Sequence, residues 1–150
     1  MMRVVDASIA VSLFTDDMFS QQVRRDVFGD ASSEILAPSL ILFELQAALA
    51  KRFMSEKMTL AQLLEAPAIL GSLVRFVPLD FHAAREALKL SMLALQLTAE
   101  GGDVRPLPAN VYDCAYIATA FAENAELVTA DQRQAAIAQS VGCKVRLIRN

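Results

Sequence analysis

Apolar and polar positions follow two alternating periods along the chain, and this alternation predicts the fold class. Short apolar runs rich in β-branched residues predict strands at 3–5, 34–38, 74–79, 126–130 and 144–148. Between them, apolar residues recur at helical spacing and predict helices at 7–14, 15–28, 39–53, 59–73, 80–97, 111–125 and 131–142. Strands that alternate with helices favour a parallel sheet covered on both faces, a three-layer α/β domain.

Three segments carry more specific expectations. The helix at 39–53 is apolar almost all round, so we expect it to be largely buried. Pro67 is expected to interrupt the helix at 59–73, because proline lacks the backbone N–H that a helix interior uses. The segment 98–110 contains two glycines and two prolines and is predicted to be a loop. It is too short and too central for a domain boundary, so we expect a single domain over 1–150.

Composition narrows the class of partners. A chain of 150 residues fits one domain with a sizeable core, and its hydrophobic content of 55% suggests that a partner or a second copy covers some apolar surface. The net charge is −3 and the pI is about 5.1. An overall basic field for nucleic acid is therefore absent, and any phosphate binding must be local or carried by a bound cation.

Cysteine and histidine usage argues against two kinds of site. Cys114 and Cys143 have no metal-ligand spacing, and His82 is the single histidine, so zinc binding and cysteine–histidine catalysis are not expected. We expect two buried free thiols and a surface histidine on the 80–97 helix, which Asp80 would cap. The start "MMRVVDAS" lacks the apolar segment of a signal peptide, and no apolar run is long enough to span a membrane. A soluble cytoplasmic protein is the expectation.

Three aspartates stand where capping residues stand. Asp6 and Asp131 each follow a predicted strand and precede a predicted helix, and Gln134 occupies the reciprocal capping-box position for Asp131. Asp113 follows Asn110 by three residues in a similar arrangement. Helix capping is an ordinary role for such residues, so these positions alone leave capping and metal binding both open.

Glu44 is harder to explain as a structural residue. It lies inside "LILFELQAAL", and because the predicted helix starts near Ser39, it is not expected to serve as a first-turn cap. The nearest cations on the helix, Lys51 and Arg52, are two turns away, roughly 11 Å along the axis. An unpaired buried carboxylate costs on the order of several kcal/mol. We therefore expect Glu44 to reach a cleft, a partner or a cation.

Topology predicts that these acids gather. In open parallel sheets, ligands bind beyond the carboxyl ends of the strands, where the strand order reverses. Asp6 and Asp131 would stand at this edge, with Asp113 and Glu44 near helix starts on the same side. Four crowded carboxylates repel one another unless a cation balances them. Mg²⁺ and Mn²⁺ prefer carboxylate oxygens, so the pattern favours a site for one of these ions.

Four segments, "VVDASIAV", "APSLILFELQAALAK", "VYDCAYIATAFAENAELVTAD" and "KVRLI", together resemble a PIN domain. More narrowly, they resemble the VapC type, the toxin half of bacterial and archaeal toxin–antitoxin pairs. The resemblance covers nearly the whole chain. It includes an aspartate after the first strand, a glutamate in an apolar helix, and a D-x-A-x-x-A helix leading to a strand that ends T-x-D. It implies a three-layer α/β/α domain with a parallel five-stranded sheet in the order 3-2-1-4-5.

The resemblance also implies a site and an activity. Asp6, Glu44, Asp113 and Asp131 would form a catalytic cluster that binds Mg²⁺ or Mn²⁺, and Thr129 would orient it by hydrogen bonding. The implied activity is metal-dependent endonucleolytic cleavage of RNA. The implied partners are a second copy of the toxin, giving a homodimer, and a small antitoxin protein.

Two departures from the family pattern bear on substrate choice. The predicted loop at 98–110 is longer and richer in glycine and proline than expected before the third acid. After the fourth acid, the family often has a large apolar residue, whereas this chain has Arg133 and Gln134. Arg133 is a candidate contact for an RNA phosphate, although an arginine there can equally be a solvated helix residue. Lys51 and Arg52 are weaker candidates.

Other functions fit less well. A non-catalytic module that dimerises or binds an antitoxin-like helix would suit the apolar content and the stripe "SLILFELQAAL", but the presence of all four acids argues against lost chemistry. A phosphoacceptor receiver domain needs a pair of neighbouring acids after the first strand and a late lysine, and "RVVDAS" has one acid. A dinucleotide-binding domain needs a glycine-rich first turn, and "VVDASIAV" has no glycine.

Overall fold

A computed structural model describes residues 1–100 and 110–149, and at its centre is a five-stranded sheet. The strands are β1 (Met2–Val5), β2 (Glu34–Pro38), β3 (Arg75–Val77), β4 (Glu126–Thr129) and β5 (Val145–Leu147). All pairings are parallel, and the order is β3-β2-β1-β4-β5, as the resemblance implied. The strands near the centre are mostly apolar, with Arg3 as the charged exception in β1, because both faces of the sheet are covered.

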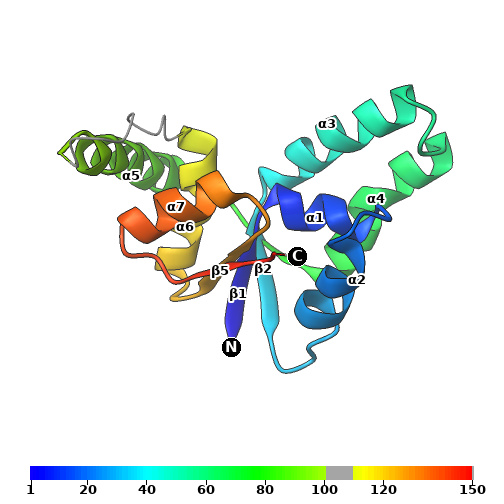
Figure 1. The fold of residues 1–150 in the computed structure, drawn as a ribbon, viewed down its shortest axis with the longest axis horizontal. Helices are drawn as coiled ribbons and strands as arrows, with labels where there is room; N and C mark the ends of the chain where they lie inside the picture. The colour runs from blue at the N-terminus through cyan, green and yellow to red at the C-terminus, as the bar shows by residue number, and fades with distance from the viewer. Residues whose placement is uncertain (101–109, 150) are drawn as a thin grey trace.

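Helices form the two outer layers. They are α1 (Ala7–Leu13), α2 (Ser20–Val23), the π-helical turn η1 (Arg24–Phe28), α3 (Ile41–Met54), α4 (Leu60–Leu73), α5 (Phe81–Glu100), α6 (Val111–Ala122) and α7 (Gln132–Ser140). Figure 1 shows α1 to α4 on one side of the sheet and α5 to α7 on the other. This confirms the three-layer α/β/α class. The single helix predicted at 15–28 is in fact a loop followed by α2 and η1, because Asp17 accepts hydrogen bonds from Phe19 and Ser20 in a turn and the helix starts only at Ser20.

The α6 helix is the most deeply packed of the helices that lead to the sheet's carboxyl edge. Every residue from Cys114 to Ala120 is buried, and the helix contacts β1, β2 and β4. Its small side chains allow this close approach, and its one buried threonine, Thr119, donates its hydroxyl to the carbonyl oxygen of Ala115 (2.8 Å). A helix held this firmly fixes the positions of the polar side chains in its first turns.

The expectation that the 39–53 helix is largely buried is wrong. Only Ile41, Leu45 and Leu49 of α3 are buried, and Phe43 on the opposite face is 75% exposed. The reason is that α3 packs on α1 and α4, and Figure 1 shows the α3–α4 pair extending away from the sheet. One face of α3 therefore belongs to the core, while the apolar residues of the other face lie at the surface.

The interruption expected at Pro67 is also wrong. The α4 helix runs from Leu60 to Leu73 with Pro67 inside it. A capping box at its start, in which Thr59 and Gln62 exchange side-chain and backbone hydrogen bonds of 2.9 and 3.2 Å, stabilises the first turn. Beyond Pro67 the buried side chain of Leu70 packs in the core. Capping and packing thus outweigh the hydrogen bond that the proline lacks.

The other local expectations hold for the most part. Asp80 caps α5 by accepting a hydrogen bond from the N–H of Ala83 (2.8 Å). His82 is exposed, and Cys114 and Cys143 are buried free thiols. The α5 helix continues to Glu100, so the loop expected to begin at residue 98 is wrong for residues 98–100, and residues 101–109 lie outside the described part of the chain.

Burial raises the pKa of both cysteine thiols to about 11, so they stay protonated at neutral pH. Within residues 1–100 and 110–149, none of the helices combines the length and the apolar character that crossing a bilayer requires.

Candidate functional site

The carboxyl ends of β1 and β4 lie side by side and bring Asp6 next to Asp131. Val5 of β1 is in register with Val128 of β4, and the N–H of Asp6 donates to the carbonyl oxygen of Val128 (3.4 Å). The buried hydroxyl of Thr129 donates to the Asp6 carboxylate (2.5 Å) and accepts from the N–H of Asp131 (2.9 Å). One hydroxyl group therefore ties together the ends of two neighbouring strands.

Asp6 is buried, with 3% of its surface exposed. Its Oδ1 accepts hydrogen bonds from the Ser8 hydroxyl (2.6 Å) and from the N–H of Ile9 (3.1 Å), so Asp6 caps α1. Burial raises the pKa of Asp6 to about 6, and the charge of Asp131 adds to the rise, although the hydrogen bonds from Ser8, Thr129 and Ile9 oppose it. The fold thus keeps a carboxylate where its charge is unfavourable.

The first turns of α6 carry Asp113 and Tyr116, three residues apart and therefore on one face of the helix. Burial raises the pKa of Asp113, and the charges of Asp131 and Glu44 raise it further, while the charge of Arg133 partly offsets them. Asp113 therefore lies within electrostatic range of two other predicted site residues.

Glu44 lies in the first turn of α3, because this helix begins at Ile41 and not near Ser39. The start expected near Ser39 is therefore wrong, but no side chain caps this helix start, so the expectation that Glu44 is not a first-turn cap is confirmed, and the helix dipole favours its charge. Its Oε2 accepts a hydrogen bond from the hydroxyl of Tyr116 on α6. Burial, and then the hydrogen bond and charge of Glu44, raise the pKa of Tyr116 well above its usual range, so the phenol remains a donor. Tyr116 thus anchors Glu44 from the opposite helix.

A pocket of about 310 Å³ lies between α1, α3, α6 and α7, and we call it the acid pocket. The four predicted acids all line it, together with Ser8, Lys51, Tyr116, Gln134 and three alanines. The structure therefore brings together residues from four segments of the chain. Lys51 is the one cationic residue among the described residues that line the acid pocket, so four carboxylates face a single lysine.

The donors of the acid pocket suit a hard divalent cation, because Mg²⁺ and Mn²⁺ take carboxylate oxygens and water. Nevertheless, no three aspartate, glutamate, histidine or cysteine side chains among the described residues converge closely enough to hold an ion. Asp6 is bound to the hydroxyl of Thr129. Glu44 is bound to the hydroxyl of Tyr116, and Asp131 caps α7. These three carboxylates carry like charges and stay apart, and each is held by its own hydrogen-bond partner.

Asp131 caps α7 as the sequence pattern indicated, but without a full capping box. Its Oδ1 accepts from the N–H groups of Arg133 (2.8 Å) and Gln134 (3.2 Å). The N–H of Asp131 is bound to Thr129, and the Gln134 amide group donates to the carbonyl oxygen of Asp113 (3.3 Å). The reciprocal bond expected from Gln134 is replaced because its side chain bridges to α6.

The capping arrangement expected at Asn110 and Asp113 is likewise half formed. The side chain of Asn110 caps α6 by accepting from the N–H of Tyr112 (2.9 Å). Asp113 lies in the first turn, and its side chain lines the acid pocket. Capping therefore does not account for Asp113.

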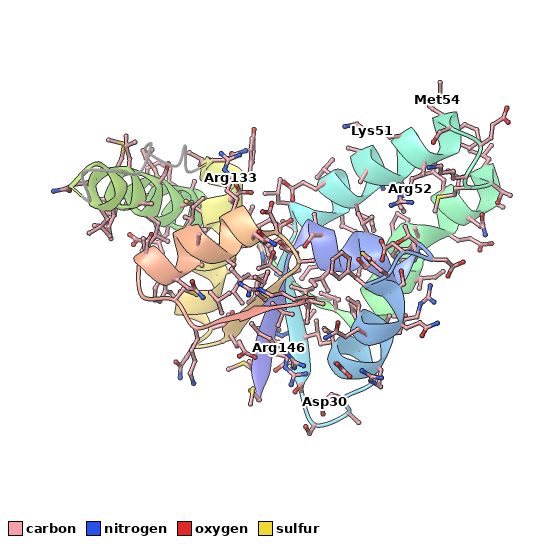
Figure 2. The ribbon with its side chains drawn as sticks, viewed as in Figure 1. Asp30, Lys51, Arg52, Met54, Arg133 and Arg146 are labelled. Carbon is pink, nitrogen blue, oxygen red and sulfur yellow. The ribbon has the colours of Figure 1, made fainter. Side chains whose placement is uncertain are left out.

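Basic residues stand on both sides of the acid pocket. Figure 2 shows Arg133 on the side of α6 and α7, and Lys51 on α3 across the opening. Lys51 lines the acid pocket, whereas Arg133 acts on it through its charge, which lowers the pKa of Asp113. The sequence pattern ranked Lys51 below Arg133, but the structure gives Lys51 the closer position.

Three residues of the site were not expected from the sequence. Ser8 binds Asp6, Tyr116 binds Glu44, and Gln134 reaches across to α6. Tyr116 had a usable signal, because a tyrosine that points into an apolar layer needs a partner for its hydroxyl. Ser8 had none, since it reads as an ordinary residue of a first helical turn, and Gln134 was expected only as the capping-box partner of Asp131.

Comparison with known proteins agrees with the fold. The family model described as the PIN domain matches residues 3–140. A comparison with curated proteins gives no match.

Solved structures similar to the chain include one of VapBC2 from Rickettsia felis bound to a DNA fragment from its promoter. It has a TM-score of 0.67 and 19% identity, and the match covers 99% of this chain and 100% of that one. Mycobacterium tuberculosis VapC20, described as a Sarcin-Ricin loop cleaving toxin, is similar with a TM-score of 0.66 and 16% identity over 94% of this chain and 95% of that one. At these identities the likeness concerns the fold.

The residues matched by the family model include all four acids of the acid pocket and the carboxyl ends of both strands that meet there. The match extends over far more than half of the chain, and the strand order agrees with the one that the resemblance implied. This chain belongs to the PIN domain family.

Proposed function

We propose that this single PIN domain is a Mg²⁺- or Mn²⁺-dependent endoribonuclease that acts in the cytoplasm as the toxin of a type II toxin–antitoxin pair. The observation that carries the proposal is the acid pocket, in which Asp6, Glu44, Asp113 and Asp131 face one lysine. The toxin role is supported by the likeness of the fold to VapBC2 and VapC20. A second copy of the chain and a small antitoxin are the proposed partners.

In this proposal the four carboxylates are the metal ligands. A bound divalent ion supplies positive charge beside the scissile phosphate and lowers the pKa of a water molecule. Asp6 is suited to the role because its burial makes an unbalanced charge unfavourable, so a cation is bound the more readily. Thr129 orients Asp6, and Tyr116 orients Glu44, through their hydroxyl groups.

Lys51 and Arg133 are the proposed contacts for the RNA backbone. Because the chain carries a net charge of −3, phosphate binding depends on cations close to the reacting group. Lys51 approaches from α3 and Arg133 from the start of α7. A strand of RNA that crosses the acid pocket between them has a cation on each side.

A non-catalytic interaction module is the second candidate. Exposed apolar side chains on the α3–α4 arm favour it, since such surface suits a protein partner. They are Phe43, Phe53, Met54, Leu60 and Leu64. A toxin also needs such a surface, so the two candidates differ only in chemistry. Failure to bind Mn²⁺ at millimolar concentration would favour the module.

The test of the proposed function is RNA cleavage by the purified protein. We expect cleavage with added Mg²⁺ or Mn²⁺ and none with excess chelator. Attack by water breaks the P–O3′ bond, so the products should carry a 5′-phosphate and a 3′-hydroxyl. Activity that survives chelation, or products that end in a 2′,3′-cyclic phosphate, would rule out the proposed chemistry.

Tyr116→Phe is expected to lower cleavage by about 10-fold to 100-fold, the range typical for loss of a group that orients a metal ligand. Without the hydroxyl, Glu44 is no longer held from α6. The Mn²⁺ concentration that gives half-maximal activity should rise, and KM for RNA should not. Tyr112→Phe, an exposed tyrosine on the same helix, is the matched control. An unchanged Mn²⁺ dependence in Tyr116→Phe would show that Tyr116 is structural.

A further inference from the structure

A second pocket opens directly beside the acid pocket. It has a volume of about 490 Å³, larger than the acid pocket. The two are continuous, since Ala7, Ser8, Ala48 and Asp131 line both. The second pocket extends over α1 to the loop that joins α1 to α2. A polymer with one group at the four acids can therefore place a neighbouring group here.

Two side chains of that loop give the second pocket its chemistry. Phe19 is partly exposed and lines the pocket with an aromatic ring. Asp17 is its acidic lining residue outside the acid pocket, and the remaining lining residues there are apolar or small. An aromatic face beside a hydrogen-bond acceptor is the combination on which proteins bind unstacked bases of single-stranded RNA.

The loop is held in one conformation. Oδ1 of Asp17 accepts from the N–H of Phe19 (3.0 Å) and the hydroxyl of Ser20 (2.9 Å), and Oδ2 accepts from the hydroxyl of Thr15 (2.7 Å). Thr15 and Ser20 are buried. Arg24 donates to the carbonyl oxygen of Thr15 (3.0 Å) and holds the loop from η1. A binding group held this way loses little freedom when a ligand arrives.

Asp17 has acceptor capacity left for a ligand. A carboxylate oxygen has two acceptor positions, and within the described part of the chain Oδ2 accepts from Thr15 alone. Burial by itself would raise the pKa of Asp17, but the hydrogen bonds from Thr15, Ser20 and the backbone outweigh it and lower that pKa. The group is therefore ionised at neutral pH and acts only as an acceptor.

We propose that the second pocket, here called the base pocket, binds the nucleobase next to the scissile phosphate and selects a base with an exocyclic amino group. This inference rests on the proposed ribonuclease function. Phe19 stacks on the base, and Oδ2 of Asp17 accepts a hydrogen bond from the amino group. Cytosine, adenine and guanine carry such a group, whereas uracil has none and presents a carbonyl oxygen where cytosine has its amino group, which the carboxylate repels.

The test compares Asp17→Asn with the parent on RNA of random sequence, with Mn²⁺ added and the cut sites mapped by sequencing. At one position beside the cut, the parent should prefer cytosine over uracil by on the order of 10-fold, the effect of one hydrogen bond to a charged group. In Asp17→Asn an amide N–H₂ replaces the acceptor, so this preference should be lost or reversed. Asp16→Asn is the matched control. Asp16 precedes Asp17 in the chain, but its side chain is 96% exposed and does not line the pocket.

Phe19→Leu tests the stacking surface while keeping an apolar side chain in place, since Phe19 also packs against the core. It should raise KM for RNA by about 10-fold, because one stacked base is lost, and leave the thermal melt nearly unchanged. The substitution should also weaken RNA binding in a protein that does not cleave RNA. On the Asp6→Asn background, fluorescence anisotropy with a labelled cytidine-rich RNA should give weaker binding when Phe19→Leu is added.

The outcomes separate the base pocket from the nuclease proposal. If the parent cuts RNA and both variants keep its base preference and its KM, the base pocket is refuted and the nuclease stands. If the parent cuts no RNA with either metal, both proposals fall. If the variants weaken only the binding of a protein partner, the pocket is a docking surface for protein and the inference is overturned.

Discussion

Asp6→Asn is expected to abolish RNA cleavage, by at least about 100-fold, in a protein that folds as stably as the parent or more so. The activity is lost because an amide is a poor ligand for a hard cation and leaves the site one negative charge short. The helix cap survives, since the asparagine oxygen can still accept from Ile9. The new amide N–H₂ can donate to Thr129, whose hydroxyl can turn toward Oε1 of Gln134, 3.5 Å away.

The stability follows from the burial of Asp6. Its pKa is raised from 3.8 to about 6, which corresponds to about 3 kcal/mol of unfavourable free energy for the ionised form at neutral pH. Asparagine removes that cost along with the charge. Thermal melts at pH 7 in chelator should therefore place the midpoint for Asp6→Asn at or above that of the parent.

Asp30→Asn is the control, with effects on stability and cleavage opposite to those of Asp6→Asn. Its carboxylate accepts from the largely buried guanidinium of Arg3 (2.9 Å), and hydrogen bonds from Ser32 and Ser33, together with Arg3, hold the pKa of Asp30 well below its usual range. This substitution should lower the melting midpoint and leave cleavage unchanged. If Asp6→Asn cleaves RNA as well as the parent does, the assignment of the acid pocket is wrong.

The metal-free protein is expected to lose stability as the pH rises from about 4 to about 7. Between its unfolded pKa of 3.8 and its folded pKa of about 6, Asp6 binds its proton more tightly in the folded state. Stability is therefore fully present below the window and falls through it. The raised pKa of Asp113 acts in the same direction. Asp17, Asp26, Asp30 and Glu86 have lowered pKa values and act in the opposite direction, but below their ordinary values of 3.8 for aspartate and 4.5 for glutamate.

Added Mn²⁺ should reverse this loss. An ion that binds only the folded state at 100 times its Kd stabilises by about 2.7 kcal/mol. Because protons compete for the same carboxylates, the shift in melting midpoint should be large at pH 7 and small at pH 5. Asp6→Asn should remove most of the shift, and Asp30→Asn should keep it. An equal Mn²⁺ shift in parent and Asp6→Asn would mean that the ion binds elsewhere.

Local patterns in the sequence predicted much of the fold. The strands ending before Asp6 and Asp131 were recognisable from their apolar runs, and the resemblance implied that they are neighbours, which the sheet confirms. Strand ends in a parallel sheet share one edge, so the gathering of the acids could be anticipated from topology. The roles of Asp6, Glu44, Asp113 and Asp131 as metal ligands remain a prediction.

Errors arose where a local sequence pattern was used to infer how a segment packs on the rest of the structure. The apolar residues of α3 indicated burial, yet Phe43 is exposed, because what a helix buries depends on how many neighbours pack on it. Pro67 indicated a break, but the capped first turn and the packing of Leu70 keep α4 intact. The start of α3 was set two residues early, near Ser39, although the conclusion that Glu44 does not cap the helix is correct.

The sequence by itself determined the order and type of the elements, since hydrophobic periodicity records which face of each segment is buried. Only the tertiary structure decided which hydrogen bonds hold the acids in the acid pocket. Tyr116 and Glu44 are 72 residues apart in the chain, and Thr129 and Asp6 are 123 apart. The raised pKa of Asp6 and the base pocket beside it have the same origin. They depend on distances between segments that no local spacing encodes, because each segment's pattern is satisfied by burial against any apolar neighbour.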